Sequence, residues 1–226
     1  MRIAICVKPV PDLGAAFVSK SRGELVEQAA PVPNPADENA VELAGALRDG
    51  GELVAFSVAA TGAAEAVRPA LAMGADRAYL VDDPAVQGGD GLAVAKALAA
   101  LIRQAGDFDL VLCGAGSLVH GAGQVGPRLA AALGLPFACR VTDAKPTAGG
   151  IAVTRAGSLG PAELAPPALL TIEAGCNTPR LPNAIAVMKA ARKPAETVTI
   201  EALGLAAEEA GAAGSGCRLR VTELPG

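Results

Sequence analysis

The chain has 226 residues, a formal net charge of -4, 51% hydrophobic residues and 2% aromatic residues. This length fits one large α/β domain with an added arm, and the hydrophobic content excludes a disordered chain. The negative charge gives no general attraction to nucleic acid, and the few aromatic rings leave little surface on which bases could stack. We therefore expect no nucleic-acid partner.

The N-terminal sequence and the cysteines indicate the compartment. "MRIAICVKPVPD" contains an apolar stretch of about five residues, too short for a signal peptide or a membrane span. The cysteines show no C-x-x-C spacing, which is typical of reduced thiols, and no metal site is expected. They are Cys6, Cys113, Cys139, Cys176 and Cys217. The sequence therefore predicts a cytoplasmic protein without membrane insertion.

Short apolar runs alternate with segments of helical period in the first 134 residues. The runs that predict buried strands lie at residues 2–7, 52–59, 77–81 and 108–113. Helical segments separate them, which is the pattern of βαβ units and a parallel sheet. We therefore predict a doubly wound, mostly parallel α/β fold.

The helices between these strands carry start and stop signals. In the segment 34–51, Asn34 is a candidate cap and Pro35 stands at the first helical position. In the segment 61–74, Thr61 is a candidate cap, Gly74 a stop, and Pro69 is expected to bend the helix or shift its start. The segment 90–106 has the apolar stripe of a helix that packs on a sheet.

Beyond Gly134 the pattern changes to short strand-like runs without intervening helices. These runs predict a small antiparallel extension or meander around residues 136–172. We place a domain boundary after residue 190, because residues 191–226 read as an extended arm whose order depends on a partner chain. The long non-helical stretch from Pro9 to Pro33 supports the same expectation.

A glycine-rich turn, "GAGSLVHGAGQVGPRLAAALG", follows the fourth strand and leads into a helix. Such a turn suits a phosphate, but it lacks the lysine of a P-loop, and Val119 breaks the dinucleotide spacing G-x-G-x-x-G. Gln124 is either a ligand contact or a solvated residue, and His120 is the only histidine and lacks a partner of its type. Without a recognisable nucleophile and base, the sequence favours binding over catalysis.

Several segments together resemble the small (beta) subunit of electron transfer flavoproteins. They are "MRIAICVKPVPD", "NPADENAVELA", "RPALAMGADRAYLV", "GQVG" and "PRLPNAIAVMKAARKP", and the resemblance runs from Met1 to about Leu205. It implies a Rossmann-like fold of the adenine-nucleotide-binding type over residues 1–190. It also implies a heterodimer with a homologous large (alpha) subunit, which holds most of an FAD that carries electrons from dehydrogenases to a quinone oxidoreductase.

In that family the small subunit carries AMP or, in bifurcating members, a second FAD. The resemblance transfers its nucleotide contacts onto Cys6, Asn34, Pro35, Ala36, Asp37, Val58 and the turn from Gly114 to Val125. Within the turn the expected contacts are Gly114, Gly116, His120, Gly121, Gly123, Gln124 and Val125, followed by Gly126. No catalytic residue and no independent reaction are expected.

The chain departs from the family pattern in and around the turn. Ala115 replaces a lysine, and Val119, His120 and Gly121 replace an acidic run that would hold the turn through hydrogen bonds to backbone N–H groups. The aromatic residues that the family places near Leu13 and Ala36, beside the flavin, are absent. Their loss would alter flavin packing and potential.

The segment "EAGCNTPRLPN" resembles the family's loop for recognising partner dehydrogenases, here residues 173–184. The expected contacts are Cys176, Asn177, Pro179 and Arg180, and Cys176 stands where the family has an anchoring leucine. A thiol buries less apolar surface than leucine, which weakens such an anchor by about 1 kcal/mol. Two alternatives stay open: a nucleotide sensor that has lost the flavin role, and a bifurcating member with a second FAD.

Overall fold

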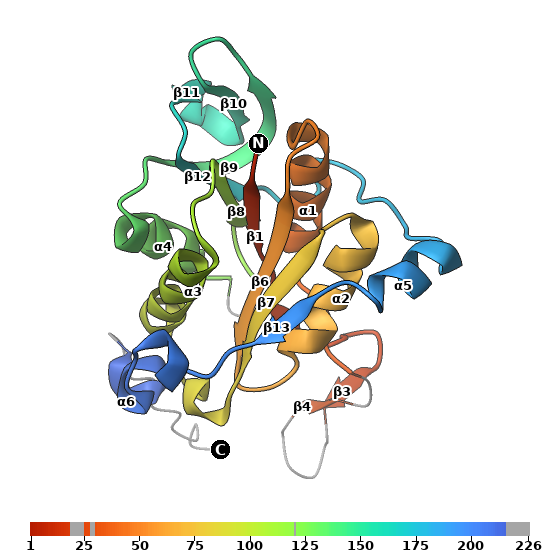
Figure 1. Ribbon diagram of the computed structural model, residues 1–226, viewed down its shortest axis with the longest axis vertical. Coiled ribbons are helices and arrows are strands. Elements are labelled where there is room, and N and C mark those ends of the chain that lie inside the picture. Colours follow the sequence, from red (N-terminus) through yellow and green to blue (C-terminus); the bar gives the residue numbers. More distant parts are fainter. Residues whose placement is uncertain (19–24, 28–29, 120, 216–226) are drawn as a thin grey trace, which may run out of the picture.

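The predicted strands form the centre of a nine-stranded sheet with helices on both faces (Figure 1). The computed structural model describes residues 1–18, 25–27, 30–119 and 121–215. The sheet order is β11-β10-β9-β12-β8-β1-β6-β7-β13, and the strands from β9 to β13 in this order are parallel. The structure is thus the predicted doubly wound α/β fold.

The strands of the main sheet are β1 (Ile3–Cys6), β6 (Leu53–Ala59), β7 (Arg77–Asp82), β8 (Leu110–Gly114), β9 (Phe137–Pro146), β10 (Ile151–Arg155), β11 (Ala162–Leu164), β12 (Ala168–Ile172) and β13 (Ala195–Thr197). The α-helices are α1 (Pro35–Leu47), α2 (Ala63–Met73), α3 (Gly91–Ala105), α4 (Val125–Leu133), α5 (Ala184–Ala190) and α6 (Ala207–Ala210). The 3-10 turns are η1 (Pro84–Val86), η2 (Gly157–Leu159), η3 (Glu201–Leu203) and η4 (Ala212–Gly214). Two short ladders pair β2 (Pro9–Val10) with β5 (Val32–Pro33) and β3 (Ala16–Val18) with β4 (Leu25–Glu27).

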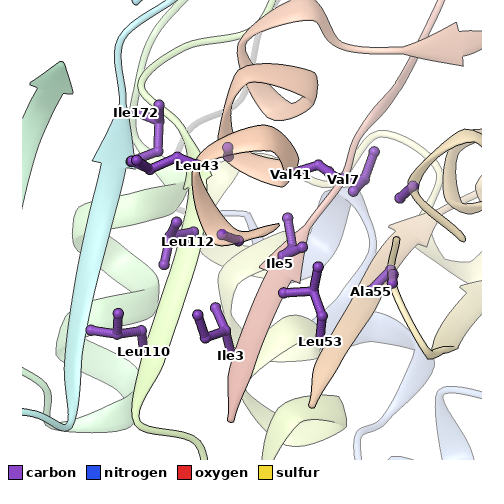
Figure 2. Close-up of a cluster of buried hydrophobic side chains, with 14 of the residues drawn as sticks. Ile3, Ile5, Val7, Val41, Leu43, Leu53, Ala55, Leu110, Leu112 and Ile172 are labelled. Carbon is purple, nitrogen blue, oxygen red and sulfur yellow. The ribbon is translucent and has the colours of Figure 1, made fainter. Parts of the chain in front are cut away.

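The core has two halves because successive side chains of a strand point to opposite faces of the sheet. Ile3 and Ile5 lie in the cluster under α1 and α2, together with Leu53 and Leu112 (Figure 2). Ala4 and Cys6 of the same strand lie in the other cluster, which α3 and α4 cover. Burial on both faces explains why these strands read as continuous apolar runs.

Two details of the helix termini differ from the sequence prediction. Gly62, with φ +84°, occupies the N-cap position of α2 in place of Thr61, and the helix continues through Pro69 to its stop at Gly74. Asn34 does stand at the N-cap position of α1, but its side chain makes no capping hydrogen bond. Its amide instead forms hydrogen bonds with the glycine-rich turn after β8.

The antiparallel extension is present, and the last of the predicted runs inserts between earlier strands. β9, β10 and β11 form an antiparallel ribbon, while β12 returns to lie between β8 and β9 as a parallel neighbour of both. The segment after residue 190 contributes β13, which pairs in parallel with β7, and Ile200 is only 1% exposed. This segment therefore packs on its own domain as far as Ala210.

The buried position of Ile200 gives a test of this packing. Ile200→Ala should lower the free energy of unfolding by about 2–4 kcal/mol, because it leaves a cavity in the core beside α3. Ile185→Ala is the matched control: Ile185 is 64% exposed, so its truncation should cost less than about 0.5 kcal/mol. Urea unfolding of both variants measures the difference, and equal losses would contradict the packing of residues 195–210 on the sheet.

Candidate functional site

The strand order reverses at β1. The chain runs from β1 through β6 to β7, and then crosses to β8 on the other side of β1. In open α/β sheets, ligands bind beyond the carboxyl ends of the strands at such a reversal. The segment after β1, the glycine-rich turn after β8 and the N-terminus of α1 meet at this edge.

A buried carboxylate joins the two strand ends that flank the reversal. Asp37 is 4% exposed, and its two oxygens accept hydrogen bonds from the backbone N–H groups of Lys8, at 2.8 Å, and Gly114, at 2.7 Å. Burial raises the pKa of Asp37 to about 6, although the hydrogen bonds from Lys8 and Gly114 act in the opposite direction. Asp37 thus acts as a clamp between β1 and β8.

Asn34 forms a second clamp, on the turn itself. Its amide Nδ2 donates to the carbonyl of Gly116 at 2.9 Å, and its Oδ1 accepts from the N–H of Leu118 at 3.0 Å. The residue is 2% exposed. The first turn of α1 therefore sets the shape of the segment after β8. Asn34 thus holds the turn, although the turn lacks the acidic residues that the family resemblance leads one to expect there.

The fold itself requires several glycines of the turn. A Cβ on Gly114 would lie 2.5 Å from Oδ1 of Asp37, and one on Gly126 would lie 2.2 Å from Cγ2 of Thr171. Gly123 has φ +59°, and its Cβ would lie 2.7 Å from the carbonyl oxygen of Ala115. A Cβ on Gly116 or on Gly121 would make only ordinary contacts, but Gly121 has φ +59°, so Gly116 is explained neither by packing nor by a positive φ.

A hollow of about 520 Å³ lies between the start of α1, the turn, Arg140 of β9 and the segment that follows β12. Its lining includes Pro35, Ala36, Gly116 and Gly121 of the predicted site. Arg140 stands at its border with φ +53°, and its guanidinium donates to both carboxylate oxygens of Glu173 at 2.9 Å. The hollow thus brings together Asn34, Ala36, the glycine-rich turn and this ion pair.

The N-terminus of α4 directs backbone donors toward the same edge. Gln124 is exposed at the N-cap position without a side-chain cap. None of the described residues accepts a hydrogen bond from the N–H groups of Gly123, Gln124 or Val125. These donors and the helix dipole suit an anion such as a phosphate.

The remaining predicted residues divide into two groups. Cys6 and Val58 are 5% and 8% exposed and belong to the core cluster that α3 and α4 cover. Burial, and then the charge of Asp37, raise the pKa of the Cys6 thiol, which keeps it protonated. His120 lies outside the described residues.

The predicted recognition segment is bound to α1. Asn39 donates to both the carbonyl and Oδ1 of Asn177, at 2.8 and 2.7 Å, and accepts from the N–H of Gly175 at 2.9 Å. The guanidinium of Arg180 donates to both oxygens of Glu42, at 2.8 and 2.9 Å. The side chains of Asn177 and Arg180 therefore form hydrogen bonds with helix α1 of the same chain.

Other residues of this segment divide between core and surface. Cys176 is half-buried and packs against the core, and Pro179 is also half-buried. Leu181 is 94% exposed, and α5 exposes Ile185 by 64% and Met188 by 68%. The apolar surface thus begins after the four residues predicted to make contact.

Lys8 belongs to the segment after the first strand, which the sequence places at the ligand edge, but it is not among the predicted contact residues. Its ammonium Nζ donates to Oγ of Ser117 in the turn at 3.1 Å, across a separation of 109 residues in the sequence. Burial lowers the pKa of Lys8, and the Asp37 carboxylate opposes this effect. The signal in the sequence was its place directly after the first strand, at the edge where ligands bind.

Two further searches cover the described ranges. Nowhere in them do three metal-ligating side chains gather at distances that would hold an ion. None of their helices combines the length and the apolar character that a membrane span requires.

The sheet, its reversal at β1 and the crevice at that edge define a doubly wound α/β protein of the class that binds ligands at a switch point. The electron transfer flavoprotein domain matches residues 23–203. The chain belongs to the electron transfer flavoprotein family, with the beta subunits.

Individual relatives support this assignment along the whole chain. The electron transfer flavoprotein subunit beta of Megasphaera elsdenii is 35% identical over 239 residues, which cover 100% of this chain and 88% of the relative. The subunit of the same name from Thermoanaerobacterium thermosaccharolyticum is 34% identical, with the same coverage. The caffeyl-CoA reductase-Etf complex subunit CarD of Acetobacterium woodii is 34% identical over 93% of this chain and 83% of its own length.

The raised pKa of Asp37 predicts a specific pH dependence of stability. A carboxyl with a folded-state pKa of about 6 contributes stability that is full below about pH 4 and is lost as the pH rises through 6. Relative to Asp37→Asn, the free energy of unfolding of the wild-type chain should therefore fall by up to about 3 kcal/mol between these limits.

Urea unfolding across this pH range measures the effect. Glu42→Gln is the control, because the hydrogen bonds from Arg180 lower the pKa of Glu42, so the contribution of this carboxyl to stability changes with pH in the opposite direction. Parallel pH profiles for the wild-type chain and Asp37→Asn would contradict the role given to burial of this carboxyl.

Proposed function

We propose that the chain is the small subunit of a heterodimeric electron carrier that takes electrons from dehydrogenases and passes them to a quinone oxidoreductase or another acceptor. The family match along nearly the whole chain carries this proposal. The large (alpha) subunit would hold most of an FAD, and this chain would complete its surroundings. FAD accepts electrons in pairs and releases them singly or in pairs, which is the chemistry that such a carrier needs.

A nucleotide at the switch point is the second part of the proposal. The N–H groups of Gly123, Gln124 and Val125, which have no acceptor among the described residues, fit a phosphate, and the hollow beside Asn34 and Ala36 offers room next to them. AMP is the candidate ligand, with a second FAD as the alternative. Cys6, Val58 and Asp37 would then support the site through packing and clamping rather than through polar contacts with the ligand.

Partner recognition is assigned to residues 173–184 and the helix that follows. Hydrogen bonds of Asn39 with Asn177 and of Arg180 with Glu42 hold this segment against α1. Leu181 then stands on the surface as a large apolar side chain, while Cys176 packs inward. We assign the apolar anchor to Leu181 for this reason.

The ligand content of the co-expressed heterodimer tests the proposal. Denaturing the purified complex and identifying released molecules by mass spectrometry should give FAD together with AMP, and the native complex should have a flavin spectrum. Two FAD per heterodimer would assign the switch point to a second flavin. AMP without any flavin would contradict the electron-carrier role and leave a nucleotide sensor, and a chain that never co-purifies with a large subunit would contradict the heterodimer.

The assignment of the anchor has its own test. Leu181→Asp should reduce the rate of electron transfer from a dehydrogenase that reduces the wild-type heterodimer by about tenfold, because a buried apolar anchor carries much of the energy of an interface. Cys176→Ala should change the rate less than twofold by the same reasoning. The flavin spectrum controls for assembly, and a larger loss in Cys176→Ala than in Leu181→Asp would refute the assignment.

A further inference from the structure

Lys8 brings a positive charge to the glycine-rich turn from the neighbouring strand. Its backbone is held at both polar groups: the N–H donates to Oδ2 of Asp37 at 2.8 Å, and the carbonyl accepts from the N–H of Asn34 at 2.9 Å. From this fixed backbone, Nζ reaches Oγ of Ser117 at 3.1 Å. The fold thus places the ammonium group within reach of the turn.

The other cations that border this edge are opposed by carboxylates. Residues 114–126 contain no lysine or arginine. Arg140 pairs with Glu173 at 2.9 Å, and Arg128 in the first turn of α4 faces Asp90 at 3.7 Å. In contrast, no carboxylate oxygen of the described residues lies within 4.0 Å of Nζ of Lys8.

The surroundings of Lys8 disfavour its charged form. Burial lowers the pKa of Lys8, and the Asp37 carboxylate counteracts this only in part. The residue is nevertheless exposed to solvent, so a ligand can reach its ammonium group, and an anion that binds beside it stabilises the charged form. The N-terminus of α4 favours the same sign of ligand, since its N–H groups and dipole attract negative charge.

We propose that Lys8 makes the cationic contact with the phosphate of a nucleoside phosphate at the switch point. The inference rests on the proposed nucleotide site and names the group that recognises the charge of its ligand. In P-loops a lysine within the turn reaches the phosphates. Here the lysine comes from the end of β1, and Asp37 and Asn34 position its backbone.

Binding of adenosine and AMP to the heterodimer, stripped of bound nucleotide, tests this assignment. By isothermal titration calorimetry the wild-type complex should bind AMP at least about tenfold more tightly than adenosine, which is the contribution expected of a charged hydrogen bond. Lys8→Met should bind AMP about tenfold more weakly than the wild-type complex and keep the affinity for adenosine, because it loses the charged hydrogen bond and retains the backbone donors of α4. Lys8→Arg should retain most of the preference, because it keeps the charge.

Two control variants separate charge from structure. Lys145→Met removes an exposed lysine that pairs with Asp143 on β9, and it should bind both ligands as the wild-type complex does. Ser117→Ala removes the partner of Lys8 in the turn but leaves the ammonium, so it measures how much of the AMP affinity depends on the shape of the turn. Equal losses of AMP affinity in Ser117→Ala and Lys8→Met would mean that Lys8 only holds the turn, and would overturn the inference.

The outcomes also distinguish this inference from the proposed function. If the wild-type complex binds adenosine and AMP equally, the nucleotide site stands and the role of Lys8 is refuted. If it binds neither and releases no nucleotide on denaturation, the nucleotide site fails and the inference fails with it. Should Lys8→Met not assemble, Lys8→Gln takes its place, because it also removes the charge but keeps a side chain that can donate to Ser117.

Discussion

The carboxylate of Asp37 is the interaction on which the candidate site depends. It accepts one hydrogen bond from the end of β1 and one from the end of β8, the two strands between which the sheet order reverses. Burial of this charge is unfavourable, as the raised pKa shows, but without an acceptor two buried N–H groups would lack partners. Lys8, the start of the turn and the start of α1 are therefore fixed relative to one another by one side chain.

Helix α1 extends this control to the recognition segment. Its first turn holds the glycine-rich turn through Asn34 and Asp37, and its next turn holds residues 173–184 through Asn39 and Glu42. Side chains three residues apart lie on neighbouring positions of a helix, so Asn39 and Glu42 form one contact surface. A single rigid element thus positions both the nucleotide site and the surface proposed for partners.

The sequence predicts the fold far better than the contacts within the site. Central strands buried on both faces leave continuous apolar runs, and helices between them leave periodic stripes, so both could be recognised. The return of β12 between β8 and β9 could not, because strand order depends on packing between segments far apart in sequence. The reach of Lys8 to Ser117 is of the same kind: residue spacing gives no information about contacts across 109 positions.

In the sequence, the glycines of the turn were the first indication of a phosphate site. The structure gives most of them another explanation. Gly114 and Gly126 allow α1 and α4 to approach the sheet, and Gly123 has a positive φ, so the fold requires all three even without a ligand. The argument for an anion therefore moves from the glycines to the groups around them. These groups are the N–H donors at the start of α4, which none of the residues in the described ranges accepts from, and the ammonium of Lys8. Neither resembles a phosphate motif in the sequence, because the first is formed by backbone groups and the second comes from the segment after a different strand, β1.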